Sequence, residues 1–270
     1  MENTTNVIYI TSNCNLKCEY CFEEEKRPNR TMTYDDIDRY FEGIDKISAP
    51  HSHIVLFGGE PLLYPDLIEY IVIDKILKQY NYKQYSVSMT SNGLRLLEDD
   101  IYDWFFDLRK KKYIHLEISY DGPNCYRRKD KNGNCVNHLI EKVLNKLNND
   151  NKTFAISYTL NKDNYNYCIE DMITLFETYD HLEKIILSIA SQDLDVIDND
   201  YQKSVLRLKP YLNEIYRRYR KPICEEVCDV CQKCVFNNKN LYAVPNVPYP
   251  IEHSKFANED FSLWEYCHER

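Results

Sequence analysis

Residues 14–22 read Cys-Asn-Leu-Lys-Cys-Glu-Tyr-Cys-Phe, which places three thiols in one short segment with the spacing C-x3-C-x2-C. Structural zinc sites and all-cysteine iron–sulfur clusters take four protein ligands. A loop that supplies only Cys14, Cys18 and Cys21 leaves one corner of a 4Fe–4S cluster open for a ligand that is not protein. The stretch therefore predicts a metal site with one exchangeable position. Part of a zinc site is the alternative.

Strand-like and helix-like segments alternate around this stretch. A β-branched run over residues 6–11 leads directly into it. Further strands are predicted over 53–57, 85–90, 113–119, 154–160 and 184–189. Helices are predicted over 33–47, 65–80, 99–110, 137–149, 168–179 and 201–219. Six consecutive strand–helix pairs require a parallel sheet with right-handed crossovers. Because a closed barrel of this type needs eight pairs, we predict an α/β fold with a partial (β/α)6 TIM-like barrel.

Polar or glycine-containing motifs follow the predicted strands at the rim where such folds build their active sites. Gly58-Gly59-Glu60-Pro61 follows the second strand, and Ser91-Asn92-Gly93 follows the third. Ser119-Tyr120-Asp121-Gly122-Pro123 and Asn161 follow the next two. We therefore expect the cysteine loop and these motifs to share one end of the sheet.

The composition excludes several classes of protein. The chain has 270 residues, is 43% hydrophobic and carries a net charge of −9. Its basic residues are scattered, so no nucleic-acid footprint is evident. No apolar run has the length of a signal peptide or a membrane span. We expect a cytoplasmic protein with a solvated acidic surface.

The last fifty residues differ from the rest. The alternation stops near residue 220, and a dense set of cysteines follows: Cys224, Cys228, Cys231 and Cys234, with Cys267 further on. In a cytosolic chain such clustering favours metal binding over disulfides. Residues 241–250 carry three prolines and are expected to be coil. We predict one domain over 1–220 and a small cysteine-rich metal-binding extension over 221–270.

The cysteine stretch resembles the signature of radical S-adenosylmethionine (SAM) enzymes, C-x3-C-x-Φ-C, with Tyr20 as the aromatic residue Φ. The Gly-Gly-Glu motif after the second strand is similar to a second motif of that family. The resemblance implies a 4Fe–4S cluster on the three cysteines and SAM on its open iron. It also implies reductive cleavage of SAM to a 5′-deoxyadenosyl radical, hydrogen abstraction from a substrate, and a reducing partner such as flavodoxin or ferredoxin.

The resemblance also implies roles for individual side chains around SAM. Gly58 and Gly59 would allow close backbone approach, and Glu60 would accept a hydrogen bond from the SAM ammonium. The segment from Ser119 to Pro123 resembles S-[LI]-D-G-P of the SPASM/twitch branch, which includes anaerobic sulfatase-maturating enzymes and peptide maturases. That branch implies Ser119 at the SAM site and Arg128 on the SAM carboxylate. Three further polar residues would lie near SAM or serve as turn residues: Thr90, Asn92 and Asn161.

For the extension, the resemblance implies one auxiliary 4Fe–4S cluster on four of its five cysteines, with structural zinc as the alternative. The same branch favours a peptide or protein side chain as substrate. A small molecule or nucleotide is the alternative substrate. A non-catalytic iron–sulfur or zinc scaffold is the alternative from another functional class.

Overall fold

The structure is a computed structural model, and it describes residues 4–21, 30–45, 51–190, 208, 210–211, 214–215, 217–221, 223–225, 240–243 and 251–252. Within these ranges, no helix has the length and apolar character needed to cross a membrane. The predicted helix over 201–219 lies largely outside them. Those of its residues that are described adopt helical conformation at 208, 210–211, 214–215 and 217–219.

Six strands and their helices follow the predicted alternation. The strands are β1 (Thr4–Thr11), β2 (His51–Gly58), β3 (Gln84–Ser91), β4 (Ile114–Ser119), β5 (Phe154–Leu160) and β6 (Leu182–Ile189). The helices are α1 (Tyr34–Asp45), α2 (Pro65–Glu69), α3 (Asp99–Lys111), α4 (Asn137–Asn149) and α5 (Cys168–Thr178). The α2 helix continues as a π-helical segment, η2 (Tyr70–Gln79), and two 3-10 turns, η1 (Pro61–Leu63) and η3 (Leu94–Leu97), precede α2 and α3. Each predicted strand is confirmed, and the ends move by a few residues.

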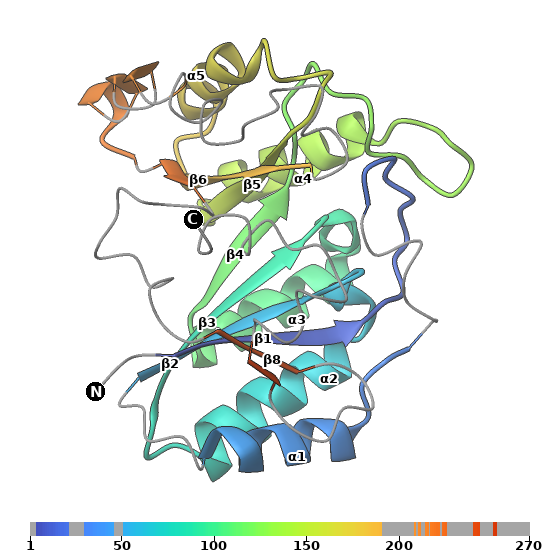
Figure 1. Cartoon of the computed structure of the whole chain (residues 1–270), viewed down its shortest axis with the longest axis vertical. Coiled ribbons are helices and arrows are strands. Elements are labelled where there is room, and N and C mark those ends of the chain that lie inside the picture. Colours follow the sequence, from blue (N-terminus) through green and yellow to red (C-terminus); the bar gives the residue numbers. More distant parts are fainter. Residues whose placement is uncertain are drawn as a thin grey trace.

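The strands form one open sheet in which β1 to β6 lie side by side in chain order, each parallel to its neighbour. Figure 1 shows them fanning through the molecule from β1 to β6. This arrangement confirms the α/β fold with an open, partial barrel.

Short strands extend the sheet at both edges. The segment β7 (Ile223–Glu225) pairs with β6, and β8 (Asn240–Ala243) pairs with β1 and with β9 (Ile251–Glu252). The expectation of coil is therefore wrong for residues 241–243, where the run Leu-Tyr-Ala supplies backbone groups to the edge of β1. Since segments beyond residue 220 join the sheet, the domain boundary stays a prediction.

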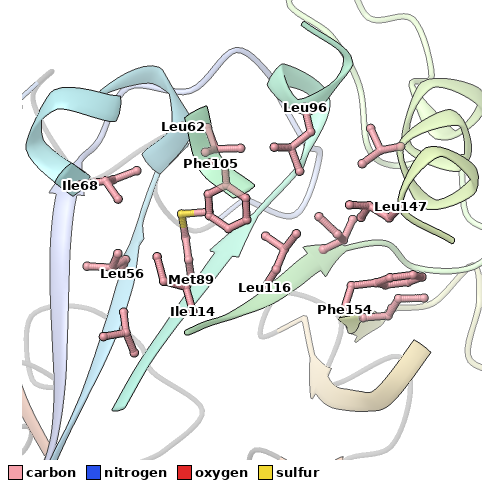
Figure 2. Packing of buried hydrophobic residues seen from close by; sticks show 14 of the residues in the cluster. Leu56, Leu62, Ile68, Met89, Leu96, Phe105, Ile114, Leu116, Leu147 and Phe154 are labelled. Atoms are coloured by element: carbon pink, nitrogen blue, oxygen red, sulfur yellow. The ribbon is translucent and has the colours of Figure 1, made fainter. Parts of the chain in front are cut away.

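One face of the sheet carries the core. Residues at alternate strand positions are apolar and buried beneath the helices, as the period of two in a strand requires. Figure 2 shows Leu56, Met89 and Leu116 of three successive strands beside Phe105 of α3. Burial of such large side chains contributes roughly 2 kcal/mol each, so the helix-covered face holds the sheet that positions the loops.

The α1 helix, which follows the cysteine loop in sequence, begins with a reciprocal cap formed by Thr33 and Asp36. Thr33 Oγ1 accepts a hydrogen bond from Asp36 N at 3.2 Å, and Asp36 Oδ2 accepts one from Thr33 N at 2.9 Å. These reciprocal bonds satisfy two backbone donors at the helix start. The cap fixes where the chain leaves the loop region and enters the helical layer.

Candidate functional site

The cysteine loop is held against the end of β2 by backbone hydrogen bonds. Gly59 N donates to Thr11 O at 2.7 Å, and Glu60 N donates to Asn13 O at 2.9 Å. A Cβ atom on Gly59 would collide with the carbonyl of Asn13, and one on Gly58 would collide with that of Thr11. The two glycines therefore permit close approach of one loop to another in this structure.

Glu60 connects the loops after β2 and β3. Its buried carboxylate accepts hydrogen bonds from Leu62 N at 3.0 Å, Ser91 Oγ at 2.7 Å and Asn92 N at 2.8 Å. Burial raises the pKa of Glu60, and these three hydrogen bonds oppose the rise. A carboxylate offers about four acceptor positions, so the internal bonds occupy most of them.

Asn92 carries this connection on to the cysteine loop. Its Nδ2 donates to Asn15 Oδ1 at 2.8 Å and lies 3.9 Å from Cys14 Sγ. The ends of β1, β2 and β3 are thus joined by polar contacts at one rim. Glu60, Asn92 and both glycines lie there together, as expected from the sequence.

The other side of the cysteine loop pairs with the segment that follows β4. Lys17 N donates to Lys129 O at 2.7 Å, and Glu19 N donates to Arg127 O at 3.0 Å. Leu16 forms an antiparallel bridge with Asp130. In this register Cys18 lies directly opposite Arg128, and side chains so placed on antiparallel strands are close neighbours.

Asp121 links this pair to Tyr20. Arg128 Nη2 donates to Asp121 Oδ1 at 2.8 Å, and Tyr20 Oη donates to Asp121 Oδ2. Thr159 N, in β5, donates to Asp121 Oδ1 at 3.1 Å. The guanidinium of Arg128 lies 5.5 Å from the centre of the Tyr20 ring. One buried carboxylate therefore fixes the cysteine loop to β4 and β5.

The residues around the thiols fit an iron–sulfur cluster that carries a further ligand. Burial raises the pKa of Cys14 to about 12, and the neighbouring Glu60, Cys18 and Cys21 add to the rise. A thiol in that setting keeps its proton unless a cation replaces it. In the described part of the chain, Arg128 Nε is a buried donor without a hydrogen-bond partner, which suits an anionic ligand.

The thiols are not arranged around a single ion. Among the described residues, no three Cys, His, Asp or Glu side chains are gathered tightly enough to hold one metal ion. A cubane cluster does not need that arrangement, because each thiolate binds a different iron atom. The described residues therefore do not form a preformed site for a single zinc ion.

Three other predicted residues form contacts with the strands and loops around them. Thr90 Oγ1 donates to Glu117 Oε2 at 2.9 Å on the open face of the sheet. Ser119 ends β4 and is paired in register with Ser157. Asn161 is fully buried, and its Nδ2 lies within hydrogen-bond distance of Thr159 O and Cys125 Sγ. The Asn161 amide is thus used within the fold, as a turn residue would be.

Of the cysteines in the extension, only Cys224 falls within the described residues, where its backbone forms part of β7. The other four lie outside them: Cys228, Cys231, Cys234 and Cys267. The auxiliary site therefore stays a prediction.

Sequence reasoning missed the parts played by Asp121, Asn15 and Arg127. Asp121 stands in the quoted motif after β4, and its buried charge required a partner. Its position between Ser119 and Gly122 was therefore a usable signal. The pairing of Glu19 with Arg127 joins segments more than a hundred residues apart, so no local sequence pattern predicts it.

Comparison with known proteins gives related sequences and folds. The radical SAM cyclopropyl synthase TigE of Paramaledivibacter caminithermalis is 25% identical over 199 residues, covering 67% of this chain and 40% of that protein. A protein of Methanocaldococcus jannaschii named "Probable GTP 3′,8-cyclase" is 24% identical over 257 residues, covering 93% and 77%. Among solved structures, native anSMEcpe with bound AdoMet and Kp18Cys peptide aligns with a TM-score of 0.67 at 19% identity, covering 82% and 63%.

The chain thus spans less than two thirds of the cyclopropyl synthase and of the solved anSMEcpe chain. The family model of the radical SAM superfamily matches residues 8–187, which include the cysteine loop and all but the last residues of β6. This chain belongs to the radical SAM superfamily.

Proposed function

We propose that the protein is a radical SAM enzyme that cleaves SAM reductively and abstracts hydrogen from a substrate. Cys14, Cys18 and Cys21 would hold the 4Fe–4S cluster. When bound, the cluster supplies one electron that splits the S–C5′ bond of SAM into methionine and a 5′-deoxyadenosyl radical.

The observation that carries this proposal is the position of the cysteine loop. The loop is fastened on one side to Gly59 and Glu60 after β2 and on the other to Arg128 after β4. It therefore lies across the rim of the sheet, with Asn92 Nδ2 3.9 Å from Cys14 Sγ and with Arg128 opposite Cys18 in the antiparallel pairing. A cofactor held there is oriented by rigid strand ends, as radical chemistry requires.

The protein's own residues would bind and shield this cofactor. Glu60 would orient the SAM ammonium with the acceptor capacity left by its internal bonds. Arg128 would orient the carboxylate through Nε. Tyr20 would cover the loop on the side of Asp121, since its hydroxyl is anchored there.

Anaerobic reconstitution tests the proposal. The wild-type protein with SAM and dithionite is expected to form 5′-deoxyadenosine, and Cys18→Ala is expected to form none. Cys168→Ala is the matched control, because this buried thiol lies at the start of α5, far along the chain from the loop. Absence of 5′-deoxyadenosine from the wild-type protein would refute both the peptide and the small-molecule versions of the function.

A peptide or protein side chain is the substrate that we favour. The solved anSMEcpe structure, which has a similar fold, holds a peptide together with AdoMet. A nucleotide substrate is the second candidate, because a relative that matches 93% of this chain is named "Probable GTP 3′,8-cyclase". Mass spectrometry of co-expressed neighbouring-gene peptides and of nucleotide pools separates the two: modified peptides support the first and altered nucleotides the second.

We further propose that the extension carries one auxiliary 4Fe–4S cluster on four of its five cysteines. The sequence clustering of Cys224, Cys228, Cys231 and Cys234 supports this proposal. Iron and zinc counts on a variant with Cys14, Cys18 and Cys21 replaced by Ala provide the test. Residual iron is expected, and zinc without iron would identify a structural zinc site instead.

A further inference from the structure

The face of the sheet opposite the helices is polar. On β3, β4, β5 and β6, most positions between the buried apolar residues hold hydroxyl, imidazole and charged side chains, the majority of them only partly exposed; Ala155 and Ile186 are the apolar exceptions. They include Ser88, Thr90, His115, Glu117, Ser157 and Lys184. A face turned to bulk water needs no such set of half-buried polar groups, so this face is suited to binding a polar molecule.

Three of these side chains form one row across four strands. Thr90 is paired in register with Glu117, Glu117 with Ala155, and Ala155 with Lys184. Ala155 is small, so Lys184 reaches over it and places Nζ 3.8 Å from Glu117 Oε1. Thr90 Oγ1 holds the other oxygen of Glu117 at 2.9 Å.

The charged pair of this row keeps unused hydrogen-bonding capacity. At 3.8 Å, the ammonium and carboxylate attract each other without a direct hydrogen bond. Lys184 Nζ has no hydrogen-bond acceptor among the residues that the structure describes, while the side chains of Lys184 and Glu117 are only 29% and 12% exposed. A half-buried ion pair of this kind adds little stability by itself, and groups left partly unsatisfied favour a ligand that completes them.

The charge of the row restricts which ligand fits. Glu117 and Lys184 cancel, and the two nearest imidazoles add no charge near neutral pH. Burial lowers the pKa of His53 to about 4, and burial also lowers the pKa of His115. A ligand anion would meet the carboxylate and a ligand cation would meet the ammonium. A neutral group with an N–H beside a C=O can satisfy both.

We propose that the Thr90–Glu117–Lys184 row binds an amide group of the substrate, with its N–H donating to Glu117 and its C=O accepting from Lys184. Two sources present this chemistry: the side-chain carboxamide of Asn or Gln in a peptide, and the ring amide of a guanine base. The inference rests on the proposed function, since that function puts the substrate on this face, and it narrows the substrate class.

Binding of matched probes to the anaerobically reconstituted protein with SAM tests the inference by calorimetry. One pair is GTP and O6-methyl-GTP, which lacks the ring N–H and has a blocked oxygen. The other is Gly-Gly-Gln-Gly-Gly and the same peptide with Met for Gln. In one pair, the amide-bearing probe is expected to bind about ten-fold more tightly, because polar groups left unpaired in a site reject the analogue. The preferred pair identifies the source.

Variants then attribute the preference to the row. Lys184→Met is expected to abolish the preference for the amide-bearing probe. The double variant Glu117→Met/Lys184→Met is expected to abolish it too. Because the double variant leaves no uncompensated charge, it provides the test if the single variant misfolds. Lys110→Met is the control, since Lys110 is 75% exposed on α3. Equal binding within both pairs, or a preference that survives in both row variants, would overturn the inference. Wild-type protein that forms no 5′-deoxyadenosine would refute the proposed function, while the binding comparison would still decide on the row.

Discussion

Cys18 and Arg128 face each other across a short antiparallel pairing between the cysteine loop and the segment after β4. The hydrogen bonds of Lys17 with Lys129 and of Glu19 with Arg127 lie on either side of them. Asp121 forms an ion pair with Arg128, in which Arg128 Nη2 lies 2.8 Å from Asp121 Oδ1. A permanent positive charge is thereby placed next to one of the three thiols that would bind the cluster. Burial raises the pKa of Cys18, and the charge of Arg128 opposes that rise.

Removal of that charge is expected to weaken both the fold and cluster retention. Arg128→Met leaves Asp121 as a buried carboxylate without its ion-pair partner, which costs roughly 3 kcal/mol of unfolding free energy. Asp121→Asn/Arg128→Met is expected to regain part of this loss. Urea unfolding and iron content measure both effects. Arg218→Met, which breaks a surface pair with Glu177 of the same 2.8 Å length, should cost less than about 1 kcal/mol; equal losses would contradict the account.

Gly59 is expected to tolerate no side chain. In Gly59→Ala the new methyl group meets the backbone of Asn13, so the loop must move away from β2. The iron bound by the loop, which is the iron retained beyond that of the variant with Cys14, Cys18 and Cys21 replaced by Ala, should fall by more than half. Gly133→Ala is the control. Its φ of +86° makes the change cost about 1 kcal/mol, but a Cβ there meets no atom within 4 Å. Normal iron content in Gly59→Ala would show that the close approach is not required.

Glu60→Gln is expected to disturb the rim as a whole. The new NH2 group cannot accept hydrogen bonds from Ser91 or Asn92 N, so at least one buried donor is left unsatisfied at a cost of about 2 kcal/mol. Ser91→Ala removes only one of these bonds and should cost about 1 kcal/mol. Thermal unfolding compares the two variants. If Glu60→Gln were as stable as the wild type, the carboxylate would not be the link between the loops.

The stability of the protein is expected to fall as the pH is lowered from about 6.5 to about 4. Burial depresses the pKa of His53 to about 4, with His115 and Lys184 adding to the effect. In that range the unfolded chain binds a proton that the folded protein resists, so unfolding becomes easier with a slope of at most one proton from this residue. His53→Gln is expected to flatten the slope, as measured by urea unfolding at several pH values. An unchanged slope would mean that His53 does not titrate in this way.

Much of the fold follows from local patterns. The β-branched runs locate all six strands, and the helical periods locate the helices between them. Burial on one face imposes a period of two residues on strands and of 3.6 residues on helices. The cap of α1 was readable from Thr33 and Asp36. The end of β2 was marked by Gly58 and Gly59.

The arrangement of the site depends on register, which local patterns do not contain. Thr90 is predicted near SAM or as a turn residue, and its hydroxyl donates to Glu117 because β3 and β4 pair in that register. Glu60 was assigned to the cofactor, and its bonds to Ser91 and Asn92 become visible only when β2 and β3 lie side by side. The strand formed by Leu241–Ala243 was missed because it is stabilised by pairing with β1.

The electron paramagnetic resonance spectrum of the reduced protein, recorded with and without SAM, tests the central claim most directly. The central claim is that the loop of Cys14, Cys18 and Cys21 holds a cluster with an open iron. The account predicts a 4Fe–4S signal that changes on addition of SAM, and a loss of the SAM-dependent change in Cys18→Ala while any signal from the extension persists. A reduced signal that is the same with and without SAM in the wild-type protein would contradict it.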